Sequence, residues 1–267
     1  MSSKMSICSF KSANSLSSTT ISGRINMDGG VSFMKPDKLT SVLFFYILII
    51  GIFITATYWG SRATSAIAQR IPMERSATVI IDAGHGGVDG GATSCTGKPE
   101  SAFNLEIALR LNDLMHLMGI HTKMIRTSDI SVYTHGETIA AKKVSDLKYR
   151  TSLVNETENG ILVSIHQNTF SESKYSGAQV FYSAKGEGQA LAEQLQTALS
   201  QTVNPSSNRK SKRADGIYLM EHIERTGVLI ECGFLSNPAE EAKLRNDSYQ
   251  KQLCCVIAAT VSNFLDR

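Results

Sequence analysis

The sequence lacks several patterns that would assign it to a common class of protein. Its five cysteines form no Cys-x-x-Cys pair and have no regular spacing, so we expect free thiols and not a disulfide framework. Its net charge of +3 is too small to indicate a nucleic-acid partner. There is no His-Glu-x-x-His, which excludes the common helical zinc-protease motif. No Gly-Lys-Ser or Gly-Lys-Thr follows the glycine-rich residues 84–91, which argues against phosphate binding there.

Charge is also absent from residues 39–59, which are almost uninterruptedly apolar. About 20 such residues span a bilayer, whereas the apolar core of a cleavable signal peptide has about 7–15. Lys35 and Lys38 precede this segment, and Tyr58 and Trp59 end it. Basic residues favour the cytoplasmic side and aromatic residues favour the membrane interface, so the pattern predicts a transmembrane signal-anchor.

This anchor divides the chain into four parts. Residues 1–38 are expected to be a disordered cytoplasmic segment, because their first part is rich in Ser and Thr without periodicity. Residues 60–76 are interpreted as a linker and residues 77–267 as a catalytic domain on the outer side of the membrane. The small residues at 66–68 leave open a cleavage of the anchor, and Met34 is an alternative start.

Beyond the linker, short apolar runs alternate with amphipathic segments. Strands are expected at residues 78–82, 120–125, 160–165, 178–182, 217–220 and 228–230, and helices at residues 99–118, 141–157, 189–202, 238–245 and 249–265. Strands separated by helices indicate a parallel sheet covered on both faces. The fold class is therefore α/β, a three-layer domain with a mostly parallel central sheet of about six strands, preceded by one N-terminal transmembrane helix.

Three of the expected strands end in side chains that can bind a metal. His85 sits in the glycine-rich loop after the first strand, His166 follows the apolar residues 161–165, and Glu231 follows residues 228–230. The carboxyl ends of parallel strands meet at one edge of a sheet, where active sites gather. The sequence therefore predicts one site that contains all three side chains.

Four segments resemble, in order, motifs of a known enzyme family. They are Ile81-Asp82-Ala83-Gly84-His85-Gly86-Gly87, Glu100 with Asn104-Leu105, Ser164-Ile165-His166-Gln167-Asn168, and Glu231-Cys232-Gly233-Phe234-Leu235-Ser236-Asn237-Pro238. The chain is similar, over roughly its last three quarters, to the zinc-dependent N-acetylmuramoyl-L-alanine amidases of the amidase 3 family. Within that family it most resembles the membrane-anchored enzymes that remodel the spore cortex.

The resemblance implies an activity, a cofactor and a location. It implies hydrolysis of the amide bond between N-acetylmuramic acid and L-alanine, with one Zn²⁺ per chain. The implied partner is peptidoglycan, as a glycan strand with its stem peptide, and the membrane is contacted through the anchor. No protein partner is indicated by the sequence. The implied location is outside the cytoplasm, with the forespore or spore envelope as one setting.

The resemblance also implies roles for individual residues. His85, Glu100 and His166 correspond to the zinc ligands, and Glu231 to an unligated carboxylate that transfers protons. Glu100 has a plain alternative role, because a carboxylate at a helix start stabilises the helix without a metal. Glu106 is a rival ligand, although the Glu-x-x-x-Asn-Leu spacing fits Glu100.

Other side chains receive secondary interpretations. Asp82 is a possible carboxylate partner for a zinc-bound histidine. The remaining histidines lack a paired spacing or a glycine-rich setting, and we expect solvated or structural roles for them: His116, His121, His135 and His222.

Two alternative functions stay open at this point. A zinc carboxypeptidase acting on wall peptides would need an arginine for the terminal carboxylate, and Arg126, Arg150 and Arg213 are available. A non-catalytic wall-binding module of the same fold would have no need for Glu231. The basic residues 209–213 either form a solvated loop or contact an anionic glycan or peptide carboxylate.

Overall fold

The computed structural model describes residues 38–68, 77–205 and 207–267, so the expectations for residues 1–37 and 69–76 lie outside the described residues. The chain divides into two units, one with a single long helix and one with the remaining elements, and each is described by itself.

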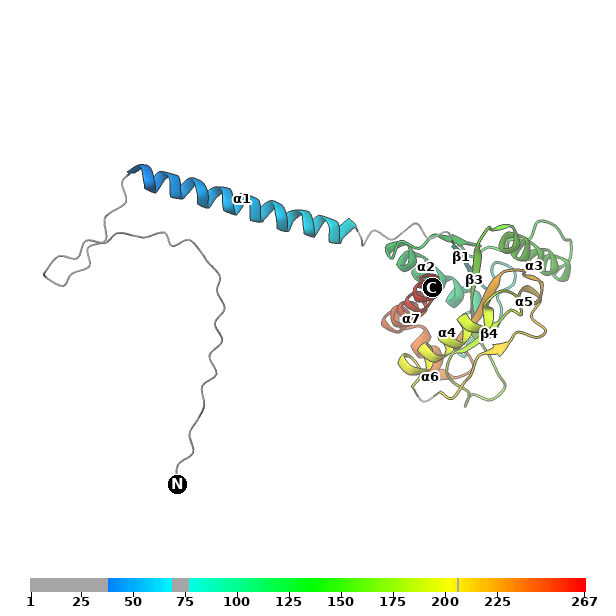
Figure 1. Ribbon diagram of the computed structural model, residues 1–267. Helices are drawn as coiled ribbons and strands as arrows, with labels where there is room; N and C mark the ends of the chain where they lie inside the picture. Colours follow the sequence, from blue (N-terminus) through cyan, green and yellow to red (C-terminus); the bar gives the residue numbers. More distant parts are fainter. Residues whose placement is uncertain (1–37, 69–76, 206) are drawn as a thin grey trace, which may run out of the picture. The chain divides into compact units, whose positions relative to one another are not determined.

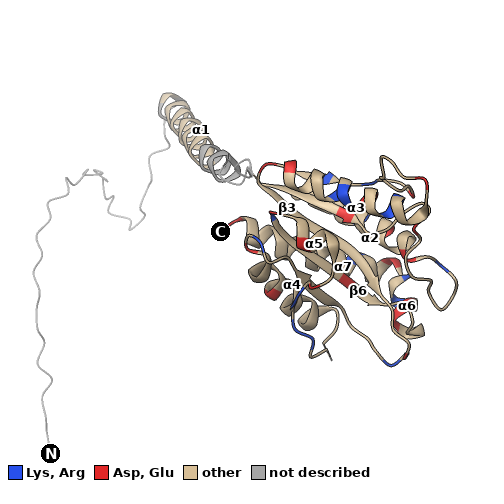
Figure 2. Cartoon of the chain, turned by 90° about the vertical axis from the view of Figure 1, so that its right-hand side faces the viewer, with Lys and Arg blue, Asp and Glu red and all other residues tan. Residues whose placement is uncertain are grey.

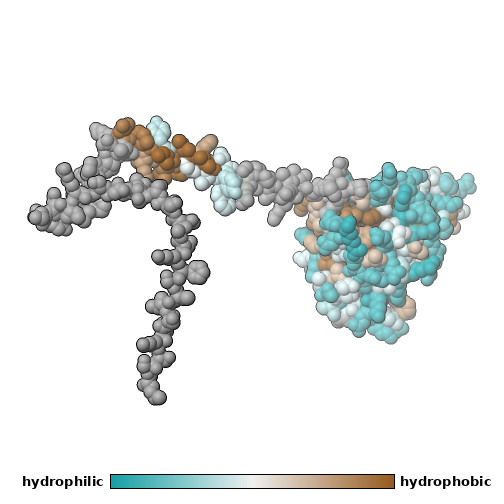
Figure 3. All heavy atoms as spheres, in the orientation of Figure 1, coloured by the Kyte–Doolittle hydropathy of each residue, from teal (hydrophilic) through white to brown (hydrophobic). Residues whose placement is uncertain are grey.

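The first unit contains helix α1, Lys38–Ala68. Its apolar part, Ser41–Trp59, has a mean hydropathy of 2.2 and is long enough to cross a membrane. The side chains of this part are exposed and form the hydrophobic stretch of Figure 3. The hydroxyls of Thr55 and Thr57 donate to backbone carbonyls one turn earlier, so they are satisfied within the helix. The helix continues to Ala68, over residues that were expected to belong to the linker.

The second unit is built on one six-stranded sheet in the order β2-β1-β3-β6-β4-β5. The strands are β1 (Thr78–Ala83), β2 (Thr122–Met124), β3 (Gly160–Asn168), β4 (Gln179–Tyr182), β5 (Lys212–Arg213) and β6 (Thr226–Phe234). Neighbours from β2 to β6 pair in parallel, β4 runs antiparallel to β6, and β5 is parallel to β4. The carboxyl ends of β1, β3 and β6 therefore lie at one edge of the sheet.

Helices cover both faces of this sheet (Figure 1). One face packs against α2 (Glu100–Leu117) and α4 (Gly188–Thr202). Helix α7 (Asp247–Leu265) packs against both of these helices, and α6 (Pro238–Leu244) lies beside β6 and α7. The other face carries α3 (Ile139–Glu156) and α5 (Tyr218–His222). Figure 2 shows Lys and Arg gathered along α3. The predicted three-layer α/β architecture with a mostly parallel sheet is confirmed.

The alternation of side chains along the central strands explains the two cores. Ile81 of β1 and Val163 of β3 belong to the core under α2, α4 and α7. Their neighbours Ile80 and Leu162 belong to the smaller core under α3 and α5. Because successive side chains point to opposite faces, a strand with helices on both sides is apolar throughout, as these strands are.

Some element boundaries differ from the sequence-based expectation. Residues 217–220 were predicted as a strand, but Ile217 caps the short helix α5 and residues 218–220 begin it. Leu219, Met220 and Ile223 are buried there, at a spacing that fits a helix. Periodicity does not distinguish a strand from a helix in so short an apolar run. Lys212–Arg213, within the basic segment, forms the edge strand β5.

Candidate metal centre

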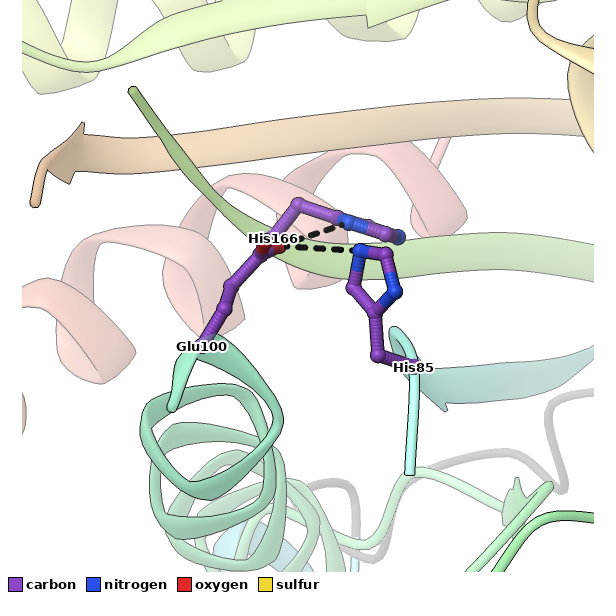
Figure 4. Close-up of side chains that lie close together, drawn as sticks. All are labelled: His85, Glu100 and His166. Atoms are coloured by element: carbon purple, nitrogen blue, oxygen red, sulfur yellow. Dashed lines mark hydrogen bonds and ion pairs between the residues drawn. The ribbon is translucent and has the colours of Figure 1, made fainter. Parts of the chain in front are cut away.

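Three separate elements bring His85, Glu100 and His166 together at the carboxyl edge of the sheet. His85 lies in the loop after β1, Glu100 is the first residue of α2, and His166 lies near the end of β3. Each offers one ligand atom, and these atoms all lie within 4.8 Å of one another. Figure 4 shows both imidazoles facing the carboxylate of Glu100. These residues form a possible metal site, and they are the three that the family resemblance marks as ligands.

The carboxylate of Glu100 is the centre of this group. Its Oε1 atom lies 3.3 Å from Nε2 of His85 and 3.1 Å from Nδ1 of His166. Its Oε2 atom accepts a hydrogen bond from the backbone N–H of Ala92, and Asn104 donates to Oε1. Burial alone would raise the pKa of Glu100, but the two imidazoles outweigh it and hold that pKa well below its usual range. The carboxylate is therefore ionised, as a metal ligand must be.

The backbone around Gly84 and His85 is shaped to admit the two imidazoles. A Cβ at Gly84 would lie 2.1 Å from Nε2 of His166, so only glycine leaves room for that ring. A Cβ at Gly91 would lie 2.6 Å from Oε2 of Glu100. His85 itself has φ 61°, a left-handed conformation that non-glycine residues rarely adopt. Gly84 and Gly91 are thus explained by their close approach to ligand-competent side chains.

Two imidazole nitrogens and one carboxylate oxygen are the donor set that catalytic zinc takes in other hydrolases. Nδ1 of His85 lies 3.0 Å from Oδ2 of Asp89, so a second carboxylate contacts the ring whose other nitrogen faces Glu100. The residues present therefore fit a metal of this kind. Asp89 was not predicted, although it lies four residues after His85 in the same glycine-rich loop.

Asp82, which was proposed to orient a histidine, is used differently. It forms an ion pair with Arg150 of α3 and accepts a hydrogen bond from Ser164 Oγ at 2.6 Å. Asp82 and Ser164 occupy paired positions on β1 and β3. The side chain lies on the face of β1 that packs against α3, and its role is to bind these elements together.

Glu106 lies outside the candidate centre. Its Oε1 atom is 2.7 Å from Nζ of Lys98, and its Oε2 atom accepts from Gln250. The exposed side chain of Glu106 thus contacts Lys98 and Gln250 of α7. The four remaining histidines stay apart from the His85, Glu100 and His166 cluster as well.

Glu231 lies beside the candidate centre on the neighbouring strand. Its Cα pairs with that of His166 across β3 and β6. Its Oε2 atom is shielded from solvent and has no hydrogen-bond partner among the described residues. Burial raises the pKa of Glu231 to about 7. A carboxyl group with such a pKa can both accept and release a proton near neutral pH.

A cavity of about 320 Å³ opens next to the centre. His85 and His166 line it from the sheet side, and side chains of α3 and α5, among them Lys143, Leu147 and Tyr218, line it opposite. Leu229 of β6 completes an apolar part of the wall. The cavity places a bound molecule within reach of the imidazoles.

The cysteines of the described part are free thiols, as expected. Cys232, next to Glu231, is fully buried, and burial raises the pKa of its thiol well above the usual value. It therefore stays protonated and packs as a small apolar side chain.

Comparison with known proteins reveals a family match and close structural similarity. The model of the amidase 3 family, described as N-acetylmuramoyl-L-alanine amidase, matches residues 79–263. The chain is 35% identical to a germination-specific N-acetylmuramoyl-L-alanine amidase of Bacillus subtilis, over 84% of this chain and 92% of that protein.

Solved structures with the same fold include one from Clostridioides difficile and one from Clostridium difficile 630. The CwlD amidase, solved in complex with the GerS lipoprotein, is 35% identical, with a TM-score of 0.68 over 72% of this chain and 99% of that one. An N-acetylmuramoyl-L-alanine amidase of strain 630 is 30% identical, with a TM-score of 0.62 over 72% of this chain and 98% of that one.

Proposed function

This chain belongs to the amidase 3 family of N-acetylmuramoyl-L-alanine amidases, and from that premise we propose how its own residues perform the reaction. The substrate is peptidoglycan, and the bond cleaved is the amide between the lactyl group of N-acetylmuramic acid and L-alanine. The observation that carries the proposal is the carboxylate of the half-buried Glu231, whose shielded Oε2 atom has no hydrogen-bond partner among the described residues, beside the cluster of His85, Glu100 and His166.

His85, Glu100 and His166 are the residues that would hold the metal, and we propose that the metal is zinc. A zinc ion with three protein ligands polarises an amide carbonyl and activates a water molecule as nucleophile. Asp89 contacts the ring of His85, and Asn104 donates to the carboxylate of Glu100, so these two donors have an orienting partner before any substrate arrives.

Glu231 moves the proton. Its carboxylate accepts a proton from the attacking water and then delivers it to the nitrogen of the departing L-alanine, which leaves as an amine. Burial raises the pKa of Glu231 above its ordinary value of 4.5, which makes its carboxylate a better proton acceptor for the first step. A binding module that lacked catalysis would have no use for a carboxyl group with a shielded oxygen atom that lacks a partner.

The carboxypeptidase alternative is disfavoured by the state of the arginines. Arg126 and Arg150 are buried, with 2% and 3% of their surface exposed, and their donors are taken by backbone carbonyls and carboxylates. Neither is free to hold the terminal carboxylate of a peptide. Arg213 is exposed and pairs with Asp215, and it does not line the cavity beside the candidate centre.

Location is part of the proposal. Helix α1 would anchor the protein in a membrane with the catalytic unit outside, where peptidoglycan lies. The similarity to a germination-specific amidase supports a role in the spore cortex. The complex of the CwlD amidase with a lipoprotein supports a search for an analogous membrane-bound partner.

Digestion of purified peptidoglycan tests the reaction. The purified protein is incubated with peptidoglycan and zinc, and the products are identified by mass spectrometry. We expect free stem peptides that begin with L-alanine, together with glycan strands that have lost them. Release of single C-terminal amino acids would instead identify a carboxypeptidase, and intact peptidoglycan would favour the non-catalytic module.

A further inference from the structure

Two buried arginines reach the backbone of the loop that carries His85. Arg126 follows β2, and Arg150 lies in α3. Between them they donate hydrogen bonds to the carbonyl oxygens of three consecutive residues, Ala83, Gly84 and His85. We call Arg126 and Arg150 the arginine pair. Neither is accounted for by the proposed reaction.

Arg126 joins the His85 loop to the start of α2. Its Nε donates to the carbonyl of Ala83 at 2.7 Å, and its Nη2 donates to the carbonyls of Gly84 at 3.0 Å and Ser101 at 2.9 Å. Gly84 directly precedes His85, and Ser101 directly follows Glu100. One guanidinium therefore contacts the backbone beside two of the proposed ligands. The side chain approaches so closely that a Cβ at Gly86 would lie 2.9 Å from Nε.

Arg150 joins the same loop to α3. Its Nη2 donates to the carbonyl of His85 at 2.9 Å, and its Nη1 donates to the carbonyl of Ala83 at 3.2 Å. The charge of Arg150 is balanced by Asp82 and by Asp146, one turn earlier in α3. Asp82 in turn accepts from Ser164, two residues before His166. The network therefore touches the chain close to each proposed ligand.

The conformation of His85 makes such support necessary. Its φ of 61° crowds the Cβ atom against the backbone, which disfavours this state for any residue except glycine. A residue in a disfavoured conformation keeps it only where the surroundings hold it. Here the carbonyls on both sides of the His85 Cα atom are hydrogen-bonded to the arginine pair.

We propose that Arg126 and Arg150 are positioning residues, which hold the backbone of residues 83–85 so that the imidazole of His85 meets Glu100 and His166. The inference deepens the proposed function, on which it rests. Arginine suits the task because its planar fork presents five donors in fixed directions, whereas lysine has a single ammonium on a flexible stem.

The test measures metal binding by the full-length protein purified in detergent. Zinc affinity is measured by competition with a chromophoric chelator, and coordination geometry is read from the absorption spectrum of the cobalt(II)-loaded protein. Arg126→Lys and Arg150→Lys are each expected to weaken zinc binding by about 10- to 100-fold, the usual effect of removing a partner that orients a ligand. Their cobalt spectra should shift toward that of His85→Ala.

Arg225→Lys is the matched control. Arg225 also donates from Nη2 to a backbone carbonyl, that of Asn155 at 3.0 Å, but it lies away from the His85 loop. Its zinc affinity and cobalt spectrum should equal those of the wild type. Arg126→Gln is a second variant at this position, in case the buried ammonium of lysine prevents folding. A neutral amide retains some of the hydrogen-bond donors without adding a charge.

The outcomes separate this inference from the proposed function. Folded arginine variants with wild-type zinc affinity and an unchanged cobalt spectrum would overturn the positioning role, even if their melting temperatures fell. Such a result would leave the amidase proposal intact. A wild-type protein that binds zinc no better than His85→Ala would contradict both.

Discussion

At the scale of single residues, the candidate centre contains two carboxyl groups in opposite electrostatic settings. Burial acts on both, but the imidazoles of His166 and His85 lower the pKa of Glu100, whereas burial prevails at Glu231 and raises its pKa to about 7. Environments that drive two pKa values apart assign different roles to chemically identical groups. Glu100 remains a constant anion, and Glu231 becomes the group that exchanges protons.

Glu231→Gln tests that division directly. Glutamine preserves the shape and hydrogen-bonding reach of the side chain but does not act as a base. We expect zinc content to be retained while peptidoglycan hydrolysis falls by about 10²- to 10⁴-fold, the usual contribution of a positioned acid–base group. Loss of zinc from this variant would make Glu231 a ligand, and near-normal turnover would assign proton transfer to another group.

The dependence of the rate on pH gives a second measure of the same residue. The base form of Glu231 is lost as the pH falls through its pKa, which burial raises from 4.5 to about 7. A bound cation nearby would lower that value, so we expect the activity to fall on the acid side with an apparent pKa between those limits. The residual activity of Glu231→Gln should lack this acid limb.

A pair of glutamate variants tests the ligand set. Glu100→Gln removes the anion that both imidazoles face, so zinc content should drop, as it should in His85→Ala and His166→Ala. Glu106→Gln is the matched control, because Glu106 pairs with Lys98 outside the centre, and it should retain zinc. Metal analysis of the purified variants, with circular dichroism to verify folding, decides between the two glutamates.

Sequence was most informative for those residues whose neighbours along the chain reveal their setting. His85 is flanked by glycines, and His166 and Glu231 follow apolar runs, so their position at a strand end could be predicted. The arginine pair could not, because Arg126 and Arg150 resemble ordinary basic residues until the fold buries them beside residues 83–85. Asp82 was expected to face a histidine, but it pairs with Arg150, because the sequence does not reveal that the fold buries the two residues side by side.

At the scale of elements, the register of the sheet fixes which side chains reach the centre. Asp82 pairs with Ser164, and His166 with Glu231, so even-numbered positions of β1 and β3 share one face with Glu231 of β6. A shift of one residue in either pairing would turn these side chains to the opposite face. The apolar pattern of the strands could be predicted, but the register depends on contacts between distant segments.

Asp82→Asn tests the ion pair that ties β1 to α3. Burial would raise the pKa of Asp82, but Arg150, with Ser164, holds it below its usual value, so the pair is charged at neutral pH. Removal of one charge leaves Arg150 buried with part of its compensation gone. We expect a loss of about 3–5 kcal/mol in the free energy of unfolding, measured by urea denaturation.

The sign of the pH effect provides the control for this variant. A carboxyl group with a lowered pKa stabilises the fold above its unfolded pKa of about 3.9, and that contribution disappears as the pH falls through the folded value. The difference in stability between wild type and Asp82→Asn should therefore be constant at neutral pH and shrink in acid. A difference that persisted unchanged in acid would show that packing, not charge, is responsible.

At the scale of the whole molecule, the two units differ in how much of their apolar surface is exposed. The apolar side chains of α1 are exposed, whereas the apolar side chains of the second unit are largely buried in its two cores. Water is a poor solvent for the exposed apolar surface of Ser41–Trp59, so we expect this helix to lie in a lipid or protein environment.

Protease treatment of intact protoplasts tests the topology. Protease added outside should remove the catalytic unit, while a tag placed at the N-terminus should stay protected until detergent is added. Lys35 and Lys38, which precede the apolar residues 39–59, are the reason for this orientation, since basic residues favour the cytoplasmic side. A catalytic unit that remains protected in intact cells would contradict the topology and with it the action on peptidoglycan.

His85, Glu100 and His166 come from three elements that meet only in the folded chain. An ion held by all three would act as a crosslink between β1, α2 and β3, and an unfolded chain would not retain it. At a free concentration 1,000-fold above its Kd, such an ion adds about 4 kcal/mol to stability, so chelation should lower the melting temperature. Metal content would then report on folding itself, because a misfolded copy would remain both empty of zinc and inactive toward the wall.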